Sequence, residues 1–212
     1  MQSIRFFRAL RNIKAAIEYP LWVAARKPAP DNHHFKVQRI RRIGREFNCR
    51  SFIETGTFFG QTLAAVSNQF EKCLSVELLE TLYEGNRRSF ARKGSVTVFH
   101  GDSGSVLGDM IDQSSGRILF WLDGHFSGGI TGHGSEVTPI MTELNSIRTK
   151  GRKDDCILID DLRLFVGTMG YPTLETVKQG IYAISPDYEV FTDGDCLVAL
   201  PASELPFPSG RC

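Results

Sequence analysis

The fold is decided by the stretch SFIETGTFFGQT, residues 51–62. It begins as a short apolar run, reaches the acid Glu54 and continues into a turn that contains Gly56 and Gly60. Glycine at these positions permits a tight turn and a close approach of the backbone to a ligand. A helical pattern follows over residues 61–70. The stretch therefore predicts one strand–turn–helix unit of an α/β fold.

Short apolar runs alternate with amphipathic helical patterns after this unit. Strands are expected at residues 73–77, 96–99, 118–122 and 156–159, and helices at residues 79–90, 103–111, 137–147 and 174–184. Strands that are apolar throughout are typical of a parallel sheet with helices on both faces. Two last strands, residues 188–191 and 196–200, are joined by a hairpin-type turn. This hairpin predicts one antiparallel strand at an edge of a mostly parallel sheet.

The first 34 residues are expected to form a basic helical arm and linker ahead of one domain of residues 35–212. Residues 3–19 fit an amphipathic helix, which Pro20 would end. Its apolar and basic side chains form separate rows, with Phe6, Leu10, Ile13 and Ile17 in one and Arg5, Arg8, Arg11 and Lys14 in the other. A second basic helix is expected at residues 35–47.

Composition limits the class of protein. The chain has 212 residues, enough for one domain with a sizeable core. Its net charge of +1 is unevenly spread, because residues 1–50 hold 12 Lys/Arg against 3 Asp/Glu and the rest hold 13 against 21. No apolar run is long enough to span a membrane, and the start lacks a signal-peptide pattern. The five scattered cysteines do not indicate a zinc site or a disulfide framework, and they favour the cytoplasm.

The basic arm has several candidate partners. Its charge favours packing against the acidic body or against a second subunit, as in a homodimer. Peripheral contact with an anionic membrane is the next expectation. Nucleic acid is disfavoured, because few aromatic rings, such as those of Phe6, Phe7 and Phe35, lie among the basic residues. A solvated helix that covers a sheet edge is the remaining alternative.

Three strand ends offer groups that suit a nucleoside, because ligands of α/β sheets bind beyond the carboxyl ends of the strands. The turn through Gly56 and Gly60 leads to the free N–H groups of a helix. Glu77 could accept hydrogen bonds from ribose hydroxyls, and Asp102 from an adenine amino group. Each has a structural alternative, which is an ordinary turn, a solvated carboxylate at a helix start and a helix cap, respectively. Because the three groups follow successive strands, they could together contact one nucleoside that lies across adjacent strand ends.

Two further strand ends carry three acids. Asp123 follows the strand at residues 118–122, and Asp160 and Asp161 follow the strand at residues 156–159. Neighbouring strands lie about 4.8 Å apart, so these carboxylates can converge. Carboxylates share a small volume only if a cation or protons intervene, and hard oxygen ligands suit Mg²⁺. The alternative is that Asp160 or Asp161 caps a helix or pairs with Arg163.

A histidine lies close to the predicted acidic site. His125 comes two residues after Asp123. Histidine titrates near neutral pH, so His125 is a candidate general base. A metal ligand and a structural loop residue are the alternatives for His125, and His133 in a Gly-rich loop could serve in its place. We assign no role to His33 and His34.

Together these residues resemble class I S-adenosylmethionine-dependent methyltransferases, over about residues 35–200. The pairing of LDG, residues 122–124, with IDD, residues 159–161, is similar to the macrocin O-methyltransferase-like group. It is more loosely similar to catechol O-methyltransferase, where such acids bind Mg²⁺. The segments IETGTFFGQT, LDGHFSGG and ILIDDLRLF also resemble a set of small bacterial methyltransferase-like proteins.

The resemblance implies a Rossmann-like, seven-stranded sheet and a role for each site residue. The methionine end of the cofactor would be held by Glu54 and the turn residues Gly56, Thr57, Gly60, Gln61 and Thr62. Glu77 would bind the ribose, and Asp102 and Ser103 the adenine. Asp123 would contact both the cofactor and the metal. Asp160 and Asp161 would be the other two metal ligands. The macrocin-type enzymes carry a further acid where this chain has His125, and the short upstream segment leaves little material for a substrate lid.

The expected activity is O-methylation of a hydroxyl on a sugar or small metabolite. Mg²⁺ would lower the pKa of the acceptor hydroxyl, and His125 would take its proton. Positioning of the reactants and electrostatic stabilisation would supply most of the rate acceleration. One alternative is a binding module that keeps the nucleoside site without turnover. Another is an NAD-linked oxidoreductase, which the missing third glycine of the dinucleotide motif disfavours.

Overall fold

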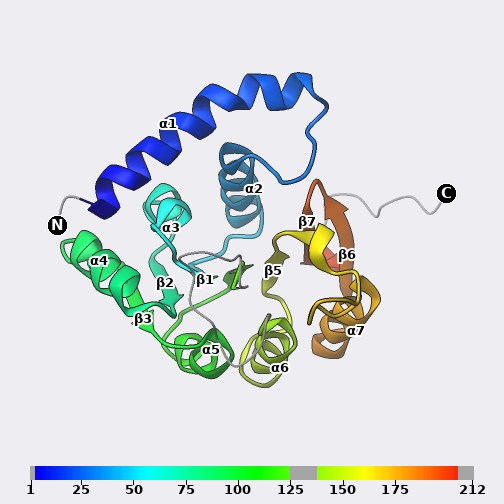
Figure 1. The fold of residues 1–212 in the computed structure, drawn as a ribbon. Coiled ribbons are helices and arrows are strands. Elements are labelled where there is room, and N and C mark those ends of the chain that lie inside the picture. Colours follow the sequence, from blue (N-terminus) through cyan, green and yellow to red (C-terminus); the bar gives the residue numbers. More distant parts are fainter. Residues whose placement is uncertain (1–2, 125–137, 205–212) are drawn as a thin grey trace.

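Seven strands form one sheet in the computed structural model, which describes residues 3–124 and 138–204 (Figure 1). The strands are β1 (Ser51–Thr55), β2 (Lys72–Glu77), β3 (Val96–His100), β4 (Ile118–Leu122), β5 (Cys156–Ile159), β6 (Tyr188–Asp193) and β7 (Cys196–Pro201). Their order across the sheet is β3-β2-β1-β4-β5-β7-β6. The first five strands pair in parallel, so their carboxyl ends share one edge of the sheet.

Helices cover both faces of this sheet (Figure 1). They are α1 (Ser3–Ala24), α2 (His33–Glu46), α3 (Gln61–Val66), α4 (Glu80–Phe90), α5 (Ser103–Asp112), α6 (Ile140–Lys150) and α7 (Leu174–Ile184), with 3₁₀ turns at Leu162–Leu164 and Ala202–Glu204. In Figure 1, α1, α2 and α3 lie above the strands and α5, α6 and α7 below them. None of the described helices is both long and apolar enough to cross a bilayer.

Successive strand residues pack into two different cores. Ile53 lies in the core with Leu107 of α5, whereas its neighbour Phe52 lies in the core with Ile40 of α2 and Leu63 of α3. All five residues of β1 and all five of β4 are buried. Burial on both faces is the reason why these strands read as continuous apolar runs.

The mostly parallel sheet with a C-terminal antiparallel hairpin and helices on both faces is confirmed, but the position of the antiparallel strand was predicted wrongly. Strand β7 pairs antiparallel with both β5 and β6, so it lies inside the sheet and β6 forms the edge. A hairpin turn fixes only that two strands are antiparallel neighbours. Which of the two strands pairs with β5 depends on the crossover through α7, and the sequence pattern does not encode that choice.

The prediction that Pro20 ends the first helix is wrong. Helix α1 continues through Pro20 to Ala24. Proline removes the hydrogen bond to the carbonyl four residues earlier, here that of Ala16. Ala16 and Pro20 are both exposed, so water can satisfy that carbonyl. Helix α1 packs against α2, α3 and α4, and the division of the chain after residue 34 remains a prediction.

The helix predicted over residues 61–70 is shorter than expected. Helix α3 ends at Val66, and Ser67 forms its C-cap. Serine and asparagine, at positions 67 and 68, favour turns over helix interiors because their side chains compete for backbone hydrogen bonds. Phe70 nevertheless packs in the core, with its ring stacked 5.4 Å from that of Phe52.

Candidate cofactor and substrate site

A cavity of about 720 Å³ lies at the carboxyl ends of β1, β4 and β5. Of the residues predicted for the site, it is lined by Glu54, Gly56, Thr57, Gln61, Thr62, Asp123 and Asp161. Five of the six predicted methionine-end residues and two of the three predicted metal ligands therefore share one space, and Gly60 and Asp160 are not among its lining residues. Glu77, Asp102 and Ser103 are not among the described residues that line it.

The turn after β1 requires glycine at two positions. Gly56 has φ +81°, and a Cβ there would lie 2.7 Å from the backbone oxygen of Asp123. Gly60 has φ +69°, and a Cβ there would lie 2.6 Å from Asn86 Oδ1. Residues with a side chain rarely adopt such φ angles, and neither contact leaves room for a Cβ. The backbone of the turn therefore lies directly against the end of β4 and against α4.

Glu54 is a buried carboxyl at the base of the cavity. Its Oε2 accepts a hydrogen bond from Ser75 Oγ at 2.7 Å, and Ser75 Oγ lies 2.6 Å from Thr57 Oγ1. Burial raises the pKa of Glu54 to about 8, and the charges of Asp123 and Glu77 contribute in the same direction. Most molecules therefore carry a proton on Glu54 at neutral pH.

Glu77 at the end of β2 is engaged by backbone N–H groups. Its Oε2 accepts from the N–H of Phe58 at 2.7 Å and its Oε1 from the N–H of Leu79 at 3.0 Å. Burial raises the pKa of Glu77 above its ordinary value, against the effect of these hydrogen bonds. The carboxylate thus fixes the turn after β1, a contact that the sequence analysis did not include.

Asp102 and Ser103 both make contacts within the protein. The carboxylate of Asp102 accepts from the N–H of Gly104 at 2.9 Å as the N-cap of α5, so the capping alternative is confirmed. Ser103 Oγ donates to Glu143 Oε1 at 2.6 Å. Glu143 is 1% exposed, and its burial was not foreseen, because it occupies the first turn of a helix where acids are usually solvated.

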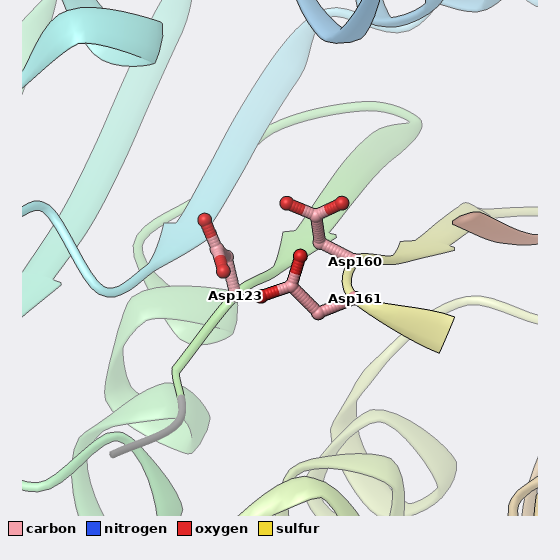
Figure 2. A group of neighbouring side chains, drawn as sticks. All are labelled: Asp123, Asp160 and Asp161. Carbon is pink, nitrogen blue, oxygen red and sulfur yellow. The ribbon is translucent and has the colours of Figure 1, made fainter. Parts of the chain in front are cut away.

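The three predicted metal ligands come together. Asp123 follows β4, and Asp160 and Asp161 follow the adjacent strand β5. Figure 2 shows the three side chains directed to the same side of the sheet edge. One oxygen from each lies within 4.8 Å of the others. The convergence expected from adjacent parallel strands is therefore present.

Lys36, a lysine that the sequence analysis missed, offsets part of the charge of this cluster. Lys36 Nζ of α2 donates a hydrogen bond to Asp160 Oδ2 and lies 3.6 Å from Asp161 Oδ1. Burial opposes the charge of Lys36, but the charges of Asp160, Asp123 and Asp161 raise the pKa of its ammonium group above the usual value. Its place in a generally basic helix gave no signal that distinguished it from its neighbours.

Asp161 also pairs with an arginine, as the structural alternative predicted. Arg163 Nη1 donates to Asp161 Oδ1 at 2.7 Å and makes a second hydrogen bond to Asp195. Asp161 has φ +55°, a conformation that is uncommon for residues other than glycine. Its carboxylate is therefore held between Lys36 and Arg163.

A histidine without a predicted role, His33, lines the cavity. His125 and His133 lie outside the described residues. His33, which received no role above, lines the cavity at the start of α2. Burial and the charge of Lys36 lower the pKa of His33 to about 4. The imidazole is therefore neutral at physiological pH.

Helix α1 lines the cavity on the side opposite the sheet. Its lining residues include Arg11, Lys14 and Trp22. Arg11 donates to Gln61 Oε1, and Gln61 Nε2 donates to Asn12 Oδ1 at 3.1 Å. The upstream segment therefore does supply material at the cavity, because α1 packs against α2, α3 and α4 and lines this side.

Solved methyltransferase structures share this fold. TomG, an O-methyltransferase of Streptomyces achromogenes solved with S-adenosylmethionine, is 14% identical with a TM-score of 0.57 over 95% of this chain and 99% of its own. An O-methyltransferase of Bacillus cereus solved with S-adenosylhomocysteine is 14% identical with a TM-score of 0.56, over 88% and 90%. The S-adenosylhomocysteine-bound PaMTH1 of Podospora anserina is 15% identical with a TM-score of 0.54, over 88% and 86%.

These likenesses establish the Rossmann-like methyltransferase fold. No protein-family model and no curated protein matches the chain in sequence. The narrower resemblance to the macrocin O-methyltransferase-like group stays a prediction.

Proposed function

We propose that the protein transfers the methyl group of S-adenosylmethionine to a hydroxyl of a small molecule or glycan. The observation that carries the proposal is the cavity in which the turn through Gly56 faces Asp123 and Asp161. Proteins of the same fold bind S-adenosylmethionine or its demethylated product. Transfer to a hydroxyl requires that the hydroxyl lose a proton during the reaction. Charged groups beside the turn through Gly56 suit this step, because they can stabilise the charge that develops on the acceptor oxygen.

The cofactor's methionine end would lie against the turn after β1. Gly56 and Gly60 keep the backbone free of side chains there, and Thr57, Gln61 and Thr62 supply polar groups around it. Glu54 would face the α-amino group, and a bound cation would lower its raised pKa and favour the carboxylate.

The nucleoside would lie beyond the cavity, along the ends of β2 and β3. Glu77 already accepts two backbone hydrogen bonds, but a carboxylate offers about four lone pairs, so ribose hydroxyls can still donate to it. Asp102, whose carboxylate caps α5, would be the acceptor for the adenine amino group. Ser103, buried against Glu143, would shape the adenine site through its position at the start of α5.

The carboxylate cluster fits a divalent cation by its chemistry. Asp123, Asp160 and Asp161 are hard oxygen donors, and Asp160 Oδ1 is buried without a hydrogen-bond partner among the described residues. When bound, Mg²⁺ would lower the pKa of an acceptor hydroxyl. Because like charges repel, a metal at this place would require the Lys36 ammonium to move away from Asp160.

Lys36 is the cation of the cluster when no metal is bound. Its ammonium group lies between α2 and the end of β5, where it can stabilise negative charge on an acceptor oxygen. Metal assistance and lysine assistance are thus two versions of one mechanism, and they differ in whether the acceptor site needs Mg²⁺.

In the transfer step, an electron pair of the acceptor oxygen forms the new bond to the methyl carbon while the carbon–sulfur bond breaks. The products are the methyl ether and S-adenosylhomocysteine, and the hydroxyl proton goes to a base. His125 is the proposed base, and the neutral imidazole of His33 is the second candidate. Substitution of each by Gln, with the rate measured for both, would identify the base.

Calorimetry with S-adenosylmethionine and S-adenosylhomocysteine is the first test. We expect micromolar to submillimolar binding by the wild type, and no binding even at roughly millimolar ligand would overturn the proposal. Transfer of a labelled methyl group to a panel of hydroxyl compounds, with and without Mg²⁺, is the second test. Cofactor binding with no transfer to any compound would favour a binding module.

A further inference from the structure

An apolar row on the outer side of α1 is left uncovered by the rest of the described chain. The row consists of Phe6, Leu10, Ile13, Ile17 and Leu21, which are 58%, 47%, 56%, 68% and 72% exposed. Their spacing of three and four residues places them on one face of the helix. Of the eleven large apolar side chains exposed among the described residues, seven lie on α1, so the exposure is concentrated in one element.

The opposite face attaches α1 to the body, largely through arginines. Arg5 donates to the carbonyl of Ser89 and Arg8 to the carbonyl of Phe59, each at 2.8 Å. The buried apolar residues of the helix are Ile4 and Ala15. This orientation leaves the apolar row without any role in attaching the helix. The row is therefore available to another partner.

We propose that the apolar row of α1 docks on an anionic lipid surface. From Phe6 to Leu21 the row extends about 22 Å along the helix, at 1.5 Å per residue. Residues 1–30 hold six basic side chains against one acid, Glu18. Lys14 pairs with Glu18 at 3.7 Å, whereas Arg26 and Lys27 are exposed basic residues just beyond the C-terminal end of the helix. An apolar strip with basic residues beside it is the pattern of helices that lie in a membrane interface.

Charge disfavours a second copy of the chain as the partner. If two copies paired through this row, two arms of the same positive sign would meet, and Glu18 alone would offset their charge. Anionic headgroups instead attract both the exposed basic residues and the arm as a whole. The proposal is independent of the methyl-transfer proposal, because Phe6, Leu10, Ile13 and Ile17 do not line the cavity and only Leu21 of the row does.

Co-sedimentation of the full chain with phosphatidylcholine vesicles, with and without phosphatidylglycerol, tests the proposal. We expect pelleting with the anionic vesicles, and a decline as salt is added. The double variant Ile13→Ser/Ile17→Ser should partition about tenfold less, because it removes apolar surface that would enter the lipid. The matched control is Val166→Ser/Met169→Ser, which changes side chains that are 65% and 88% exposed elsewhere and should pellet like the wild type.

Three results would overturn the proposal. They are no pelleting of the wild type, equal pelleting with neutral and anionic vesicles, and a dimer in light scattering that Ile13→Ser/Ile17→Ser converts to a monomer. Circular dichroism and the unfolding midpoint verify that each variant is folded. If the apolar variant fails to fold, Arg26→Gln/Lys27→Gln provides a second test, since it should weaken binding to anionic vesicles alone.

Discussion

Lys36 and Asp160 form a buried ion pair that joins α2 to the end of β5. The two residues are 124 positions apart in the sequence. The Asp160 side chain is fully buried and that of Lys36 is 16% exposed. A helix that precedes the sheet in the sequence thus supplies the positive charge for acids that end its central strands.

Lys36→Met should destabilise the protein and improve its response to metal. Removal of the ammonium leaves three carboxylates to repel one another and should lower the free energy of unfolding by roughly 3 kcal/mol in metal-free buffer. Mg²⁺ or Mn²⁺ should then raise the unfolding midpoint of the variant more than that of the wild type. Thermal unfolding with and without each metal measures this.

The control for this prediction is Lys150→Met, which removes an exposed lysine that pairs with Asp112 far from the cluster. It should leave the metal response unchanged. An identical metal response in Lys36→Met and wild type would show that the cluster does not take a divalent cation.

Gly56→Ala should disturb the turn after β1. At φ +81°, with the Asp123 oxygen 2.7 Å from the new Cβ, the substitution should cost roughly 2 kcal/mol of stability and weaken S-adenosylmethionine binding. Calorimetry and chemical denaturation measure the two effects. Gly94→Ala is the control, because its Cβ would meet nothing within 4 Å. Undiminished binding by a folded Gly56→Ala protein would argue against the cofactor role of the turn.

Glu54→Gln should remove part of the pH dependence of stability. Burial raises the pKa of Glu54 from 4.5 to about 8, so the folded protein retains a proton that the unfolded chain releases. The stability gained from this proton is complete below pH 4.5 and is lost as the pH rises through 8. Relative to the Gln variant, the wild type should lose up to about 1.4 kcal/mol per pH unit within this window.

Chemical denaturation of both proteins at several pH values in the window provides the measurement. The exposed acid Glu175, changed to Gln, serves as the control and should leave the slope as in the wild type. Parallel curves for wild type and Glu54→Gln would show that the carboxyl is charged in the folded state throughout.

Arg39→Met should destabilise the protein strongly. Arg39 is 2% exposed and donates to Asp31 Oδ2 at 2.7 Å and to Asp193 Oδ2 at 3.0 Å. It joins the linker before α2 to the C-terminal hairpin, and its loss would leave Asp31 buried without its partner. We expect a loss of roughly 3 kcal/mol in denaturant unfolding.

Arg42→Met is the matched control on the same helix. Arg42 is 51% exposed in its side chain and lies 3.5 Å from Asp193, so its removal should cost within about 0.5 kcal/mol. Equal losses in the two variants would mean that burial does not set the strength of the Arg39 contacts.

Local patterns predicted the sheet and most of the site. The run at residues 118–122 is apolar because both faces of β4 are buried, and this information lies within the segment itself. Parallel strands direct their carboxyl ends to one edge, so Asp123, Asp160 and Asp161 could be placed together from strand ends alone. The helix-cap role of Asp102 could be predicted in the same local way, because a cap needs only the next two residues.

The sequence by itself determined the strands, the helices and the acids at the strand ends, because each depends on neighbours along the chain. Only the tertiary structure decided that Lys36 reaches Asp160, that β7 lies inside the sheet and that the arginines of α1 face inward. Periodicity separates two faces of a helix but does not say which one faces the body. That choice depends on acceptors such as the carbonyls of Phe59 and Ser89, which come together only when distant segments pack.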